Sequence, residues 1–298
     1  MEGRCSKLHT LVDAEDPAAV LAEVQLLLDA MAMPEMLPQT AQIYRDVVRL
    51  FHGEYPGYRA SNTKYHNLEH TSAVLLAAIR LAHGAQAEGL ALSARGVGLL
   101  MTCALFHDAG LIQTEDDTEG TGAKYTVGHE ARSIRMLAEY AAAHNLPEED
   151  ARDGAHIIAC TIMDKAVAEI PFRTEELAAL GRMLGVADLY AQMADRAYLE
   201  KLFLLYREFE EAGVAGFDSE LMLLEKTEGF YENIVKRRLA EELGSMHRLM
   251  RSHFRVRHGL DADPYEEAIR KNIEYLKLVL EETRRIYRER FRRGGIIW

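Results

Sequence analysis

Apolar residues recur along most of the chain with the three- and four-residue spacing of an amphipathic helix, and strand-like alternation is scarce. In the segment that begins at Asn67, Val74, Ala78 and Leu81 fall on one stripe. Gly84 follows the stripe, and we expect that helix to end there. The pattern predicts an all-α fold.

Proline and capping residues indicate where other helices begin. Side-chain oxygens that accept hydrogen bonds from the first amides favour the N-cap, and proline is tolerated in the first turn. On these signals we expect helices at about 17–33, 38–51, 94–107, 127–144 after an N-cap at Thr126, 147–162, a longer helical region 174–198, and a last helix from Pro264 to Gly294.

The chain is long enough for one large body with helical extensions. It has 298 residues, of which 48% are hydrophobic, so it can bury a sizeable core. We expect an N-terminal helical extension over 1–60, a catalytic core over 61–215, and C-terminal helices over 216–298 that pack on the core or at a dimer interface.

The negative charge narrows the range of partners. The formal net charge is −12 at pH 7, so dedicated nucleic-acid binding, which needs a basic surface, is not expected. A small anionic substrate remains compatible, since bound metal ions reverse the local field.

Cysteine usage and the N-terminal sequence indicate the compartment. Cys5, Cys103 and Cys160 form no CxxC pair, which argues against a disulfide framework or a zinc knuckle. We expect Cys103 and Cys160 to pack in helix cores. No apolar signal core opens the sequence, and no apolar run is long enough to span a membrane. We therefore expect a reduced, cytoplasmic protein without membrane contact.

Histidines and aspartates at wide intervals are candidate metal ligands. His107 and Asp108 are adjacent at the end of a predicted helix, so both can reach one divalent ion. Asp188 lies between apolar neighbours, where an unpaired carboxylate is costly and a cation is a natural partner. The other candidates fall on further helices or helix ends, and are His70, His129 and His156. The helices must therefore converge to form the site.

The order of these residues resembles the H…HD…D signature of the HD-domain superfamily of metal-dependent phosphohydrolases. His70, the pair at 107–108 and Asp188 carry the resemblance. Residues 65–70, Tyr-His-Asn-Leu-Glu-His, are similar to the YHNxxH motif of class I cyclic nucleotide phosphodiesterases, and residues 187–189 to their ADL motif. The resemblance covers roughly residues 60–210 and implies an HD-domain helical bundle.

The resemblance also implies a role for each residue. His70, His107, Asp108 and Asp188 would bind the first metal ion, with Asp108 bridging to a second. His129 and His156 fall where dinuclear members supply ligands for that second ion. His66 matches the histidine that protonates the leaving oxygen, and lies one helical turn before His70.

Departures from the family patterns narrow the range of possible substrates. HD-GYP proteins carry a lysine shortly after the HD pair and a GYP triplet; here Ala109-Gly110-Leu111 follows and no GYP occurs, so cyclic di-GMP is not expected. Gln192 comes too early to match the purine-clamping glutamine of the cyclic nucleotide enzymes. We expect two divalent ions, Mn, Fe, Mg or Zn, and a phosphodiesterase or phosphomonoesterase that acts on a nucleotide or another small phosphate ester.

Three alternatives stay open. The same set of histidines and aspartates resembles the mixed-valent di-iron site of HD-domain oxygenases, which act on small organic substrates. A non-catalytic nucleotide sensor is a second alternative, although the intact ligand set argues against it. The C-terminal helix, with an apolar set at Leu276, Leu278, Leu280 and Tyr287, could form a homodimer interface.

Overall fold

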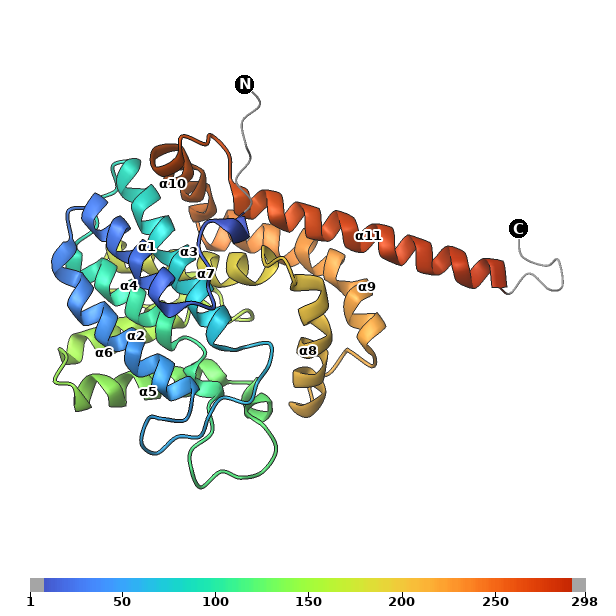
Figure 1. The fold of residues 1–298 in the computed structure, drawn as a ribbon, viewed down its shortest axis with the longest axis horizontal. Helices are drawn as coiled ribbons and strands as arrows, with labels where there is room; N and C mark the ends of the chain where they lie inside the picture. The colour runs from blue at the N-terminus through green and yellow to red at the C-terminus, as the bar shows by residue number, and fades with distance from the viewer. Residues whose placement is uncertain (1–7, 291–298) are drawn as a thin grey trace.

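The computed structural model describes residues 8–290, and within that range the protein is built almost entirely from helices (Figure 1). The α-helices are α1 (Pro17–Ala30), α2 (Leu37–Phe51), α3 (Leu68–Ala87), α4 (Ala94–Phe106), α5 (His129–Ala143), α6 (Glu148–Ile158), α7 (Glu175–Met193), α8 (Tyr198–Glu211), α9 (Glu220–Phe230), α10 (Leu249–His258) and α11 (Pro264–Arg290). Short 3₁₀ and π segments join several of them. The predicted all-α fold is confirmed.

Helix α3 is the element around which the others assemble. It contacts α1, α4, α7 and α10, and almost every residue from His70 to Ala85 is buried. One hydrophobic core contains residues from α1 through α11, including Val20, Leu100 and Ile273. The segments expected as N- and C-terminal extensions therefore pack on the same core as the central helices.

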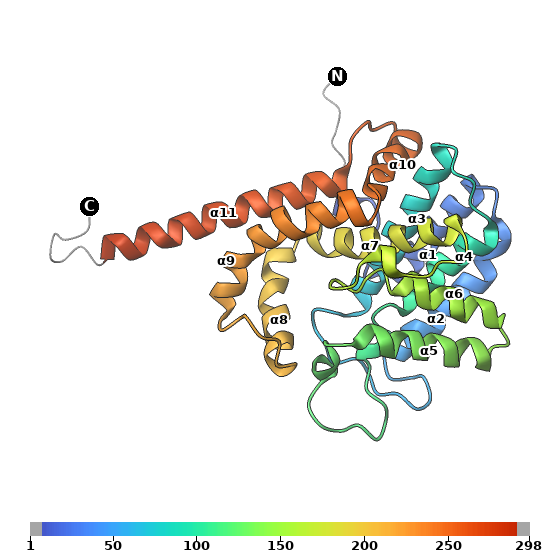
Figure 2. The ribbon, with the colours of Figure 1, turned by 180° about the vertical axis from the view of Figure 1, so that it is seen from behind.

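Helix α11 leaves the body of the molecule. It runs beside α9, and its far end lies clear of the other helices in both views (Figures 1 and 2). Leu276 and Leu280 are buried, whereas Leu278 is 59% exposed, because positions four residues apart share a helix face and the position between them does not. The prediction of one shared apolar face was wrong for Leu278. The predicted helix end at Gly294 and the side chain of Tyr287 lie outside the described part. No helix within residues 8–290 is long and apolar enough to cross a bilayer.

Several predicted helix boundaries are confirmed and others are wrong. Asn67 caps α3 and Thr174 caps α7 through side-chain oxygens. Thr126 was expected to cap α5, but it ends a 3₁₀ turn, and the left-handed Gly128 precedes α5 instead. Helix α6 stops at Ile158, short of Ile162, because Ala159 begins a turn. The region predicted over 174–198 is broken between α7 and α8.

The two described cysteines pack in the interior. Cys103 and Cys160 are free and buried. Burial raises the pKa of the Cys160 thiol to about 12, and that of Cys103 also lies well above its usual value. Both thiols are therefore protonated at neutral pH. Cys5 lies outside the described residues.

Gly84 does not end α3, which continues to Ala87. Its role is close packing, because a Cβ atom there would lie 2.0 Å from the carbonyl oxygen of Leu249, where α10 begins. We expect Gly84→Ala to lower the free energy of unfolding by about 1–3 kcal/mol, since backbone must move apart. Gly229→Ala is the matched control: its Cβ would meet nothing nearer than 3.8 Å, and alanine in a helix is favoured by up to about 1 kcal/mol. Urea unfolding measures both, and similar effects of the two substitutions would contradict this explanation.

Asp263, at the start of α11, makes the stability of the protein depend on pH. Its Oδ1 accepts hydrogen bonds from the backbone N–H groups of Tyr265 and Glu266, at 2.9 and 3.3 Å. Burial nevertheless raises the pKa of this carboxyl from 3.8 to about 7. Between about pH 4 and 7 the folded state keeps a proton that the unfolded chain has released, so this contribution to stability is lost as the pH rises through 7.

Asp263→Asn tests that dependence, because asparagine keeps a capping oxygen and does not ionise. We expect the stability of the variant relative to wild type to rise by up to about 1.4 kcal/mol per pH unit between pH 5 and 7. Urea unfolding of both proteins at pH 5, 6 and 7 measures this difference. Parallel pH profiles would show that Asp263 does not titrate in the folded protein.

Candidate metal centre

Three of the predicted ligands meet at the end of α4. His70 lies in the first turn of α3, and His107 and Asp108 directly follow α4. The Nε2 atoms of His70 and His107 are 3.3 Å apart, and Asp108 Oδ2 lies 3.3 and 3.2 Å from them. All three side chains are buried. Donor atoms bound at about 2.1 Å around one ion lie about 3.0–3.4 Å apart, so this spacing suits a metal ion.

Asp188 completes this group from α7. Its Oδ1 lies 3.3 Å from His70 Nε2 and 3.8 Å from His107 Nε2. Gln192, one turn further along α7, donates a hydrogen bond to the same oxygen at 2.6 Å and accepts one from the Tyr65 hydroxyl at 3.1 Å. Gln192 and Tyr65 therefore orient the carboxylate.

His129, the first residue of α5, faces the other oxygen of Asp108. Its Nε2 lies 3.1 Å from Asp108 Oδ1, whereas Oδ2 faces His70 and His107. A carboxylate whose two oxygens face separate groups of donors can bridge two ions. Gly110 permits this approach, because a Cβ there would lie 2.1 Å from the carbonyl oxygen of His129.

The ring nitrogens and one carboxylate oxygen of the cluster are arranged in a way that suits a bound cation. The Nδ1 of His107 lies 2.8 Å from the Ala104 carbonyl oxygen, and that of His129 lies 2.8 Å from the Thr126 carbonyl oxygen. Each Nδ1–H can donate there, which directs the Nε2 atom at the cluster, as in metal-binding histidines. Asp108 Oδ2 is buried without a hydrogen bond. The cluster of His70, His107 and Asp108 can therefore hold a metal ion.

The histidines and aspartates of the cluster shift each other's pKa values. Burial would lower the pKa of His70, but Asp108 and Asp188 outweigh it and raise that pKa to about 10. The pKa of His129 is raised to about 9 in the same way, mainly by Asp108. Burial would raise the pKa of Asp108, yet the neighbouring histidines hold it well below its usual value. These side chains thus form a buried network of opposite charges.

The surroundings of His156 differ from those of the other predicted ligands. Among the described residues it makes no hydrogen bond or ion pair with the other predicted ligands; its ring packs edge-on against Phe172, with centroids 6.1 Å apart. Its Nδ1 is buried without a hydrogen-bond partner. Its role as a ligand for a second ion stays a prediction.

His66 lies beside the cluster and is held by a residue that no sequence motif marked. Its ring centroid is 6.1 Å from that of His70 and 6.0 Å from that of His129. Its Nδ1 lies 2.6 Å from Oε2 of Glu208, a buried residue of α8. The other oxygen of Glu208 accepts hydrogen bonds from the backbone N–H groups of Lys64 and Tyr65, at 2.9 and 2.8 Å. Glu208 thereby fixes both the ring and the loop that carries it.

A cavity of about 390 Å³ opens beside these residues. His66, Asp108, His129 and Asp188 line one side of it. The rest is mainly apolar, and most of its apolar residues come from α7, α8, α9 and the segment between the last two: Leu189, Met193, Leu202, Leu205, Phe209, Phe217, Leu223 and Phe230. An organic molecule in this cavity would contact both the cluster and an apolar wall.

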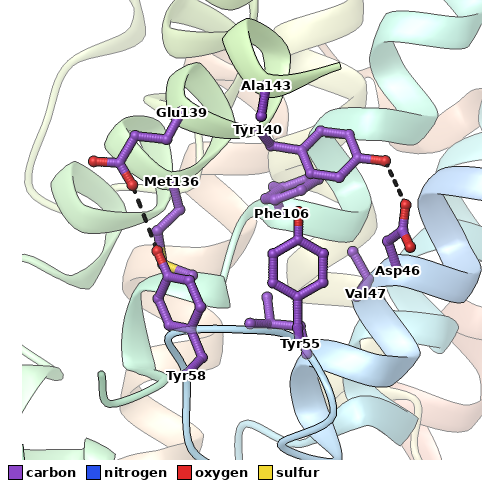
Figure 3. A pocket seen from close by; sticks show the side chains of 10 residues that line it. Asp46, Val47, Tyr55, Tyr58, Phe106, Met136, Glu139, Tyr140 and Ala143 are labelled. Carbon is purple, nitrogen blue, oxygen red and sulfur yellow. Dashed lines mark hydrogen bonds between the residues drawn. The ribbon is translucent and has the colours of Figure 1, made fainter. Parts of the chain in front are cut away.

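Figure 3 shows a smaller cavity of about 160 Å³ that contains none of the predicted ligands. In its walls Tyr140 of α5 donates a hydrogen bond to Asp46 of α2 at 2.9 Å, and Tyr58 donates one to Glu139 at 3.4 Å. Because its polar groups already pair with each other, we assign the chemistry to the larger cavity.

Most of the chain matches a known protein family. Residues 55–252 match the Npun_R2479-like family, which is more than half of the chain, so the protein belongs to that family. The matched range contains all six predicted ligands, His66 and Glu208. A comparison with curated proteins finds no match.

Proposed function

We propose that the protein is a metal-dependent phosphohydrolase of the HD-domain type. The observation that carries this proposal is the pairing of His66 with buried Glu208 at the edge of a cluster that can hold a metal ion. A metal centre alone suits many reactions, but a histidine held by a carboxylate beside it adds a proton donor, which ester cleavage needs.

Two groups of residues would hold the ions. His70, His107, Asp108 and Asp188 would bind the first, and His129 with the second oxygen of Asp108 would contribute to another site, for which His156 is a further predicted ligand. When bound, such ions polarise phosphate oxygens and lower the pKa of a coordinated water. Gln192 keeps Asp188 aligned through its 2.6 Å hydrogen bond.

His66 would act as the general acid. Because its Nδ1 is engaged by Glu208, Nε2 is the atom left to give a proton to the departing oxygen of the ester. The contact with the carboxylate of Glu208 fixes the direction of the imidazole ring. His66 therefore differs in role from His70, which lies one turn later and faces the carboxylates of the cluster.

The cavity indicates the kind of ester. Its wall of leucine and phenylalanine residues would hold an apolar or aromatic group. The substrate class is thus a phosphate ester with a planar or apolar organic part.

A substrate screen tests the proposal. Cyclic nucleotides, nucleotides and aryl phosphodiesters would be incubated with Mn²⁺, Fe²⁺, Mg²⁺ and Zn²⁺ in turn, with Asp108→Ala as the control. We expect metal-dependent release of a phosphate monoester or of phosphate by the wild-type protein only. The oxygenase alternative uses the same ligands, and iron-dependent oxygen uptake with an organic substrate would favour it instead.

A further inference from the structure

A second cluster of potential ligands lies far from the candidate metal centre. Glu23 comes from α1, and His253 and His258 come from α10; one ligand atom of each lies within 4.8 Å of the others. His83, which contacts this cluster, follows His70 by 13 positions on α3. At 1.5 Å per residue, the two clusters are about 20 Å apart along that helix. Helices α1 and α10 both contact α3 (Figures 1 and 2).

His253 has a nitrogen atom that the protein leaves unsatisfied. The residue is fully buried, and its Nδ1 lies 3.3 Å from Nδ1 of His83. One of these two atoms must carry the proton. If His253 donates, its Nε2 is a bare lone pair; if His83 donates, Nε2 carries an N–H without an acceptor. In both cases Nε2 is a buried polar atom without a hydrogen bond, as observed.

A metal ion bound to Nε2 of His253 would satisfy this atom. Histidine ligands usually donate the N–H of their second nitrogen to a fixed partner, which leaves the first free for the ion. His83 supplies such a partner for His253. On the neighbouring turn, His258 is exposed, with its ring centroid 5.8 Å from that of His253. One side of the cluster is therefore buried, and the other can admit water as a further ligand.

The surrounding charges have two opposite effects. Arg80 and Arg257 lie near His253 and bring positive charge to the cluster. The same arginines repel a cation. Glu23, which is 8% exposed and whose Oε2 lies 3.4 Å from Arg257 Nη2, supplies the negative charge that the cluster needs. An ion here would therefore depend on Glu23.

We propose that Glu23, His253 and His258 form a second metal site that binds Zn²⁺ and fastens α1 to α10 across α3. Two imidazole nitrogens and one carboxylate, with an open position for water, are a donor set that zinc favours. Because α1 and α10 otherwise meet mainly through α3, an ion held by both helices would add a further link between them. The proposal is independent of the reaction at the first cluster.

The test uses the full chain freed of metal with a chelator, and counts the Zn²⁺ bound per chain. Asp108→Ala weakens the first cluster, so the comparison is made between Asp108→Ala and Asp108→Ala/His258→Ala. We expect the double variant to bind one fewer Zn²⁺. His258 is exposed, so its removal is compatible with folding; Glu23→Gln, which keeps the shape of the side chain, is expected to have the same effect. Exposed His52→Ala is the matched control and should change nothing.

Thermal unfolding gives a second readout. Zinc at 100-fold excess over its dissociation constant is expected to raise the Tm of Asp108→Ala by about 5 °C, and the Tm of the double variant by much less. Equal zinc stoichiometry and equal Tm shifts in the two proteins would overturn the proposal.

Discussion

Asp108→Ala is expected to lose both the metal and the hydrolysis. The two oxygens of Asp108 face different histidines, Oδ2 toward His70 and His107 and Oδ1 toward His129. Its removal takes a ligand from each candidate ion position, so we expect metal affinity and turnover to fall by more than about 100-fold. Metal content after dialysis and initial rates on the best substrate measure the two losses.

The control for this substitution is a buried aspartate in the other cavity. Asp46 accepts a hydrogen bond from Tyr140 and lies outside the cluster. Asp46→Ala is expected to lower stability while metal binding at the cluster and turnover stay near wild type. An Asp108→Ala protein that folds and keeps its metal affinity would remove Asp108 from the ligand set.

His66→Ala is expected to keep the metal and lose most of the turnover. The side chain lies outside the group that His70, His107 and Asp108 form, so metal content should not change. Loss of a general acid costs about 10²–10⁴-fold in rate. Glu208→Gln, which removes the charge that holds His66, should lower the rate by less, because the ring itself remains.

The nature of the leaving group separates acid catalysis from a structural role. An ester with a nitrophenol leaving group needs little protonation, so the defect of His66→Ala should shrink on that substrate and stay large on an alkyl ester. His144→Ala, a change at the residue that follows α5 and lies outside the cluster, is the control. Equal defects on both esters, or full activity of His66→Ala on the alkyl ester, would contradict the assignment.

The sequence predicted the ligand residues of the cluster better than the residues that hold the site in place. His70, His107, Asp108 and Asp188 fall in an ordered set of motifs, and burial of Asp188 among apolar neighbours already required a partner. Glu208 could not be found in this way. It reaches His66 from 142 positions along the chain, and no local pattern separates it from the other acidic residues of α8.

Local signals likewise predicted helices more reliably than their ends. Capping by Asn67 and Thr174 follows from side chains that accept first-turn amides. Gly84 has the features of a helix end, but its meaning depends on the carbonyl of Leu249, which only the tertiary fold brings near. Such contacts between distant segments leave no periodic trace in the sequence.

Anomalous diffraction from a crystal soaked in Mn²⁺ tests the central claim most directly. The account predicts a strong peak about 2.0–2.3 Å from the donor atoms of His70, His107, Asp108 and Asp188, and a second peak between Asp108 and His129. The same soak of Asp108→Ala should show neither peak. A wild-type crystal saturated with Mn²⁺ but without a peak at this cluster would contradict the account.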